Sequence, residues 1–118
     1  MVGVIACGSS SGGDGTTTQF HCDLTTGSMN LYVCDDYDGL TNPAQISALQ
    51  SSCTDASQHG GTTGTWGSGL CSHAGSLGGC RSMSGGYTVT VWAYPGNGNS
   101  VMNQMNVCAS GGFTYVAP

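Results

Sequence analysis

The chain has 118 residues and a net charge of −5, with Arg81 as its single Lys or Arg against six aspartates. Binding to nucleic acid or to anionic lipid needs clustered Lys and Arg, so the composition argues against both. The length suits one domain, and 21 glycines with seven cysteines predict a turn-rich β fold in which disulfides supplement a small core.

The N-terminal stretch VIAC, residues 4–7, resembles a bacterial lipobox, with Val4 at −3 and Ala6 at −1. Cys7 is therefore predicted to carry a lipid anchor; the alternative is a free or paired thiol. Residues 7–19 are predicted to be a flexible Gly/Ser-rich tether. Residues 1–6 are too short and uncharged for a whole signal peptide, so we interpret them as its remnant. No stretch is long enough to span a membrane, which leaves the lipid as the membrane contact.

Two halves of the remaining chain, 20–71 and 72–118, are predicted to be an internal duplication. Three blocks align in the same order: CDLTTGSMNLYVCDDY (22–37) with CRSMSGGYTVTVWAY (80–94), NPAQISALQSSC (42–53) with NGNSVMNQMNVC (97–108), and GGTTGTW (60–66) with GGFTY (111–115). Three blocks in one order are hard to obtain by chance.

The first block of each half predicts two strands joined by a turn. Apolar and polar residues alternate around Leu31 and Val33 and around Val89 and Val91, which is the period of a half-buried strand. The turns are expected at glycine, which accepts positive φ. These glycines are Gly27 in the first half and Gly85 with Gly86 in the second.

The second block of each half predicts a short helix. Asn42 is a suitable N-cap and Pro43 a suitable first residue. The predicted buried faces are Ile46, Leu49 and Cys53 in one helix and Val101, Met105 and Cys108 in the other. The helices are expected to end at Gly60-Gly61 and Gly111-Gly112, each followed by a short strand. The predicted fold class is therefore α+β: a single disulfide-rich domain over 20–118, with a mainly antiparallel sheet and two short helices.

Six cysteines remain once Cys7 is set aside, and the duplication limits their pairing. If the halves are alike, Cys22–Cys53 and Cys80–Cys108 are equivalent bonds, and Cys34–Cys71 joins the halves. Nearest-neighbour pairing is the alternative: Cys22–Cys34, Cys53–Cys71 and Cys80–Cys108. Either set predicts an extracytoplasmic protein, because the cytosol keeps thiols reduced.

Several segments together resemble small cysteine-rich lipoproteins of the myxobacterial type, over about residues 20 to 118. They are CDDYDG, AQISALQSSC, GGTTGTW with GLC, and SLGGCRSMSGG followed by VTVWAY. The resemblance implies an envelope or cell-surface lipoprotein and carries no activity or substrate with it.

The residues that could support chemistry are few. His21 and His73 lie near cysteines, which would suit zinc, but no C-x-x-C occurs; capping or solvated histidines are the interpretation we adopt. The run Asp35-Asp36-Tyr37-Asp38 lacks the spacing of a calcium loop and is interpreted as a solubilising turn. No G-x-S-x-G is present, and Glu is absent. We expect no metal, no cofactor and no catalysis.

The aromatic residues suggest binding instead. Trp66, Trp92 and Tyr115 are expected in the core, whereas Tyr37 and Tyr94 follow strand ends and are predicted to form an exposed binding surface. The sequence thus predicts a lipid-anchored envelope protein that acts as a structural or protein-interaction module, with other envelope proteins as partners. The alternative is an extracytoplasmic binding protein for a glycan, a small ligand or a metal ion.

Overall fold

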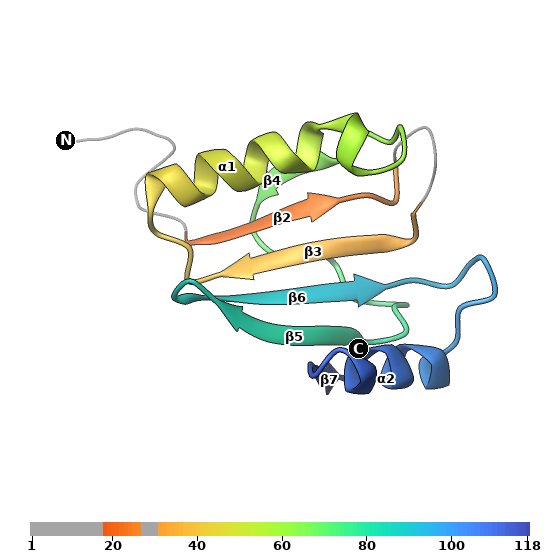
Figure 1. The fold of residues 1–118 in the computed structure, drawn as a ribbon. Helices are drawn as coiled ribbons and strands as arrows, with labels where there is room; N and C mark the ends of the chain where they lie inside the picture. The colour runs from red at the N-terminus through yellow and green to blue at the C-terminus, as the bar shows by residue number, and fades with distance from the viewer. Residues whose placement is uncertain (1–17, 27–30) are drawn as a thin grey trace.

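The computed structural model describes residues 18–26 and 31–118, which form one antiparallel sheet and two helices (Figure 1). Four predicted features lie outside the described residues: the signal-peptide remnant, the lipidation site at Cys7, most of the 7–19 tether and the turn at Gly27. Gln19, assigned to the tether from the sequence, already belongs to the first strand.

The order of the elements follows the predicted strand, strand, helix, strand pattern twice. The first half comprises β2 (Gln19–Asp23), β3 (Val33–Asp38), α1 (Pro43–Thr54), a 3-10 turn (Ala56–Gln58) and β4 (Thr65–Ser68). The second comprises β5 (Gly79–Ser84), β6 (Tyr87–Ala93), α2 (Val101–Ser110) and β7 (Thr114–Val116). The prediction of a small disulfide-rich α+β domain is confirmed.

The six strands lie in the order β4-β2-β3-β6-β5-β7, so that each half contributes three adjacent strands. The halves meet where β3 pairs with β6, and Cys34 lies opposite Trp92 there. In the sequence alignment these two residues are also equivalent. The symmetric strand order agrees with a duplication, which stays a prediction.

The strand register assigns the side chains to two faces, since directly opposed residues project to the same side of a sheet. One row across all six strands consists of Trp66, Cys22, Asp35, Val91, Cys80 and Tyr115. Cys22 and Cys80 of this row bond to the two helices, so both helices cover this side, which we call the helix face. The neighbouring row, with Asp23, Cys34 and Trp92, projects to the other side, which we call the loop face.

Helix α1 forms as its sequence predicts. The Asn42 side chain accepts hydrogen bonds from the backbone N–H groups of Ala44 and Gln45, and Pro43 opens the helix. Ile46 and Leu49 pack against the core that contains Cys53. The predicted end at Gly60-Gly61 is wrong: α1 ends at Thr54, because Asp55 leaves the helical conformation and caps the 3-10 turn that follows.

Helix α2 is rotated relative to its predicted orientation. Val101 and Met105 were expected to be buried, but they are 45% and 48% exposed. Cys108, the third residue of the predicted face, is buried as expected, and Gln104 faces the sheet in place of the other two. The Cys80–Cys108 disulfide fixes one of these positions, and the Gln104 amide donates to the carbonyls of Gly78 and Val91, each at 3.4 Å. One covalent and two polar contacts therefore set the rotation of this helix, rather than its apolar residues.

The disulfides are Cys22–Cys53, Cys34–Cys71 and Cys80–Cys108. This is the pairing that the duplication predicts, and the alternative pairs Cys22–Cys34 and Cys53–Cys71 are wrong. Each bond typically stabilises a domain by roughly 2–4 kcal/mol. Three of them compare with the whole stability expected of a domain, about 5–15 kcal/mol.

Gly64 is predicted to be required where β4 approaches the Cys22–Cys53 disulfide. A Cβ there would lie 2.6 Å from the Cys53 carbonyl oxygen and 2.8 Å from both sulfurs. Overpacking of this kind costs roughly 1–3 kcal/mol, so Gly64→Ala should lower the urea midpoint of unfolding. Thr63→Ala, at an exposed neighbour, is the control and should change stability by less than about 0.5 kcal/mol. Equal midpoints for the two variants would contradict this packing.

Candidate functional site: a pocket on the loop face

The segment that joins β4 to β5, residues 69–78, crosses the sheet on the loop face, and we call it the crossing loop (Figure 1). The Cys34–Cys71 disulfide ties its beginning to the central strand β3. Its end is tied to β6, where the N–H of Leu77 donates to the Ala93 carbonyl at 2.7 Å and the N–H of Ala93 donates to Gly78 at 3.1 Å.

Asp36 is the polar anchor beneath this loop, and it is only 5% exposed. One carboxylate oxygen accepts from the backbone N–H of Cys71, and the other accepts from the indole N–H of Trp92 at 2.7 Å. Burial raises the pKa of Asp36, while these hydrogen bonds and the charges of His21 and His73 oppose the rise. A buried carboxylate is costly unless its oxygens are satisfied, and here both are.

The acidic run is therefore not the solubilising turn that its composition suggested. It lies in the central strand β3, whose alternation places Asp36 on the loop face and Asp35 on the helix face. Burial raises the pKa of Asp35 to about 6, opposed by the charge of His59 and a hydrogen bond with Tyr37. Only Asp38, at the end of the strand, is exposed.

Tyr37, predicted to be an exposed binding residue, is 8% exposed, and that prediction is wrong. Its ring packs in the core against Trp66 and Tyr87, with ring centroids 5.6 and 6.2 Å away. It follows Asp36 on the opposite face of the same strand, so α1 covers it. Trp92 is buried as expected, while Trp66 and Tyr115 are partly buried.

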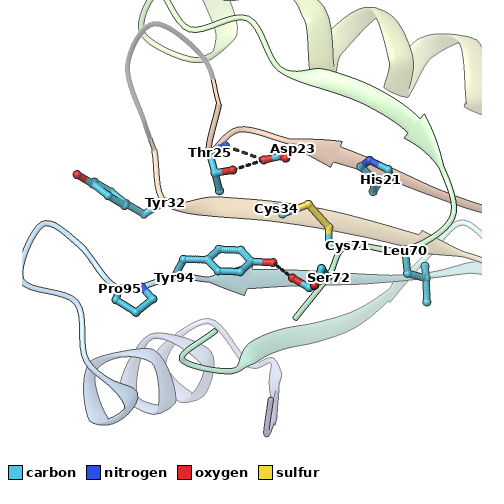
Figure 2. A pocket seen from close by; sticks show the side chains of 10 residues that line it. All are labelled: His21, Asp23, Thr25, Tyr32, Cys34, Leu70, Cys71, Ser72, Tyr94 and Pro95. Atoms are coloured by element: carbon cyan, nitrogen blue, oxygen red, sulfur yellow. Dashed lines mark hydrogen bonds between the residues drawn. A yellow bond between two sulfur atoms is a disulfide. The ribbon is translucent and has the colours of Figure 1, made fainter. Parts of the chain in front are cut away.

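A pocket of about 400 Å³ opens on the loop face beside the disulfide (Figure 2). This volume lies within the range of small-ligand sites. Its walls come from β2, from the chain just before β3, from the start of the crossing loop and from the chain just after β6. The lining residues are His21, Asp23, Thr25, Tyr32, Cys34, Leu70, Cys71, Ser72, Tyr94 and Pro95.

Two tyrosines line the pocket, Tyr94 along its length and Tyr32 at its rim, with its ring pointing outward (Figure 2). The backbone N–H of Tyr94 donates to the carbonyl of Tyr32 at 2.8 Å, which holds the two residues side by side. The Tyr94 hydroxyl donates to the Ser72 carbonyl at 2.6 Å and so spans the pocket to the crossing loop (Figure 2). Tyr94, a predicted binding residue, is thus placed in the pocket wall; its role in binding stays a prediction.

Tyr32 adopts a left-handed backbone conformation, with φ of 58°. Such a conformation is uncommon for a bulky residue and occurs often at functional sites. Its ring lies directly over Gly96, where a Cβ would fall 2.2 Å from a ring carbon. Gly96 is therefore required for the position of this ring.

The opposite side of the pocket is polar. One oxygen of the Asp23 carboxylate accepts from both the N–H and the hydroxyl of Thr25, at 2.8 and 2.6 Å. His21 Nδ1 lies 3.0 Å from the Gly69 carbonyl. Because a carbonyl can only accept, Nδ1 carries a proton and donates it to Gly69.

The histidines have separate structural contacts. His73 stacks on Trp92, with ring centroids 4.6 Å apart, and His59 Nε2 lies 2.9 Å from the Ser52 carbonyl. Among residues 18–26 and 31–118, no group of three His, Cys, Asp or Glu side chains is placed to hold a metal ion. The zinc site considered for His21 and His73 therefore gains no support.

Sequence reasoning missed most of this pocket. Tyr32 follows an apolar residue and precedes a strand, and nothing in the pattern indicates its left-handed backbone. Asp23 and Thr25 form an Asx-type turn, a local signal that could have been recognised. Their proximity to Tyr94 depends on the register of three strands, which composition does not reveal.

Comparison with models of protein families, with curated proteins and with solved structures found no match for this chain. The resemblance to small lipoproteins therefore stays an expectation. In the part of the chain that the structure describes, no helix has the length and apolar character required to cross a bilayer.

Asp35 predicts a pH dependence of stability. A pKa raised from its ordinary value of 3.8 to about 6 means that the fold favours the neutral carboxyl. This contribution is present below pH 3.8 and is lost as the pH rises toward 6, by up to about 3 kcal/mol. Asp35→Asn should therefore flatten the decline of unfolding free energy between pH 4 and 6 and stabilise the protein at pH 7.

Denaturant unfolding at a series of pH values measures this effect. Asp36, whose pKa is also raised, should preserve part of the slope. Asp38→Asn, which alters an exposed carboxylate of the same strand, is the control and should leave the profile unchanged. A profile for Asp35→Asn as steep as that of the wild type would contradict the assignment.

Proposed function

We propose that this chain is an extracytoplasmic binding module of a bacterial cell envelope that holds a small ligand in the loop-face pocket and catalyses no reaction. The observation that carries the proposal is the pocket itself. Two tyrosines and a carboxylate are brought together there by three separate segments and held by hydrogen bonds. Aromatic walls with a few fixed polar groups are typical of small-ligand sites.

The left-handed Tyr32 strengthens this proposal. A strained backbone persists only where surrounding contacts maintain it, and here Gly96 and the Tyr94 backbone do so. The result is a pocket rim that is fixed before any ligand arrives. A preformed site avoids the free-energy cost of ordering its side chains on binding.

The groups in the pocket support recognition rather than catalysis. Its cysteines, Cys34 and Cys71, are joined in a disulfide, so neither thiol is available as a nucleophile. The His21 imidazole is oriented by a hydrogen bond to the Gly69 carbonyl rather than to a carboxylate. The Tyr94 hydroxyl donates its hydrogen bond to a backbone carbonyl. These contacts fix the side chains in position and do not form a nucleophile–base pair.

The extracytoplasmic location is supported by the three disulfides, which persist in oxidising compartments. The lipobox pattern at Cys7 supports attachment to a membrane through lipid alone. The crossing loop and its pocket would then be displayed on a module tethered at its N-terminal end.

The pocket should bind at least one of three classes of probe: a neutral disaccharide, an alkylammonium ion or an alkyl carboxylate. Backbone NMR shifts on titration should concentrate at Tyr32, Ser72 and Tyr94. Tyr32→Ala should weaken the interaction severalfold, since it removes a side chain that lines the rim of the pocket. Phe113→Ala, which removes an exposed aromatic ring outside the pocket, is the control and should bind as the wild type does.

Absence of shifts with every probe would contradict a ligand site, as would equal losses in Tyr32→Ala and Phe113→Ala. A fold that Tyr32→Ala had damaged would be recognised from a change in the whole spectrum. Gly96→Ala then provides a second test, because it displaces the same ring without removing it.

The exposed apolar side chains of α2 favour a second function, as a protein-interaction module. Met102 is 71% exposed, and Met105, Val107 and Phe113 lie near it in the chain, 48%, 59% and 45% exposed. The segment from Val101 to Phe113 carries no charged residue. Methionine-rich apolar surfaces are typical of protein contacts, and the partner proposed is an apolar surface of another envelope protein.

Sedimentation of the protein extracted from its membrane in mild detergent tests this second function. We expect the wild type to sediment in a larger assembly and the double variant Met102→Ser, Met105→Ser to sediment as a single chain. Asn106→Ser, an exposed polar change on the same helix, should remain in the assembly. Identical sedimentation of the wild type and the double variant would contradict an interaction role for α2.

A further inference from the structure

We propose that the group held in the loop-face pocket is a primary alkylammonium ion, placed between Asp23 and the ring of Tyr94 (Figure 2). This inference rests on the proposed ligand site and adds the chemistry of its ligand. Three independent features carry it: the charge around the pocket, the hydrogen-bonding character of its polar groups and the nature of its remaining walls.

The charge around the pocket is negative. No Lys or Arg is among the lining residues. Arg81, the single Lys or Arg of the chain, lies on β5, where its Nε donates to the Thr90 hydroxyl at 3.0 Å. Asp23 lines the pocket, and Asp36 lies directly behind Cys71. A negative field attracts cations and repels anions, so phosphate and carboxylate ligands are disfavoured.

The pKa of Tyr94, a residue of the pocket lining, is affected by this negative charge. Burial raises the pKa of its hydroxyl, and the negative charges of Asp36 and Asp23 raise it further. Both carboxylates therefore act on the same point of the pocket wall. A bound cation placed there would be attracted by both charges.

The polar groups of the pocket are mainly hydrogen-bond acceptors. The Tyr94 hydroxyl donates its hydrogen bond to the Ser72 carbonyl, and the Thr25 hydroxyl donates to the Asp23 carboxylate. The second Asp23 oxygen has no hydrogen bond within the described residues. A complementary ligand therefore brings donors, and an –NH₃⁺ group has three donors and no acceptor.

The remaining walls suit the other parts of such a ligand. Aromatic rings attract cations through their π faces, and the ring of Tyr94 lies along the pocket (Figure 2). Leu70 and Pro95 give apolar surface for an alkyl stem. A quaternary ammonium ion would use the ring but would leave the acceptors unsatisfied, so a primary amine fits better. A neutral sugar would also bring donors, and the experiment below separates it.

The test is an NMR titration at pH 7.5 and low salt with n-butylammonium, 1-butanol, butyrate, tetramethylammonium and a neutral disaccharide as probes. Butylammonium should shift the signals of pocket residues and bind about tenfold more tightly than the neutral isostere 1-butanol, as one charge-assisted interaction allows. Tetramethylammonium should bind more weakly than butylammonium, and butyrate should not bind.

Asp23→Asn removes the charge while an amide oxygen can still accept from Thr25, so the local turn should be kept. We expect this variant to bind butylammonium about tenfold more weakly. Asp38→Asn changes the net charge by the same amount at an exposed site outside the pocket lining. It should bind butylammonium as the wild type does.

Two further probes identify the source of the amine. N-acetyl-lysine amide presents the ammonium on a lysine side chain, and 1,5-diaminopentane presents it on a free diamine. Stronger binding of the lysine derivative would indicate a basic peptide as the ligand, and stronger binding of the diamine would indicate a free polyamine. Either result supports an alkylammonium site.

Equal binding of butylammonium and 1-butanol would overturn the inference, as would equal losses in Asp23→Asn and Asp38→Asn. Shifts with a neutral disaccharide but none with butylammonium would overturn the ammonium assignment and keep the proposed ligand site. No shift at the pocket with any probe would overturn both.

Discussion

The arrangement of the loop face depends on one constraint, the attachment of the crossing loop to the central strand through Cys71. The residue is held twice: its sulfur by Cys34 and its backbone N–H by Asp36. Asp36 is in turn held by the Trp92 indole of β6. These contacts hold β3, β6 and the crossing loop together. The pocket lies beside them, next to the Cys34–Cys71 disulfide.

The two faces of the sheet differ in what covers them and in how that cover is attached. On the helix face, disulfides from Cys22 and Cys80 fasten two helices that bury little apolar surface of their own. Short helices are marginal without such support. On the loop face, a segment without helix or strand is held in place by one disulfide and by hydrogen bonds. Such a scaffold can present polar side chains in fixed positions, which a loop without attachments could not.

The helix that contributes least apolar surface to the core is also the one with most apolar surface exposed. Gln104 occupies the position where α2 meets the sheet, and this leaves Val101, Met102 and Met105 turned outward. The fold therefore provides two unlike surfaces. The pocket is small, acidic and aromatic, whereas the α2 surface is apolar and uncharged, so two different kinds of partner would recognise them.

Features that depend on neighbouring residues were predictable from the sequence, and features that depend on distant residues were not. The Asn42 cap and the Gly85-Gly86 turn, with positive φ at both glycines, followed from local chemistry. The aligned halves predicted the Cys80–Cys108 bond and left two pairings open for the other four cysteines. The burial of Asp36 followed from neither, because its partners lie 35 and 56 residues away. Tyr37 was misplaced for the same reason: a run of acids at a strand end suggests solvent unless the neighbouring strand and the loop above it are known.

Mass spectrometry of the protein extracted from its native membrane and digested with pepsin without reduction tests the account most directly. Pepsin works at low pH, where thiol exchange is slow because thiolates are scarce. The account predicts peptides that link Cys34 to Cys71, Cys22 to Cys53 and Cys80 to Cys108, with a lipid on the peptide that begins at Cys7. A peptide linking Cys22 to Cys34, or free thiols at Cys34 and Cys71, would contradict it, because the crossing loop would then lack its covalent attachment to β3 beside the pocket.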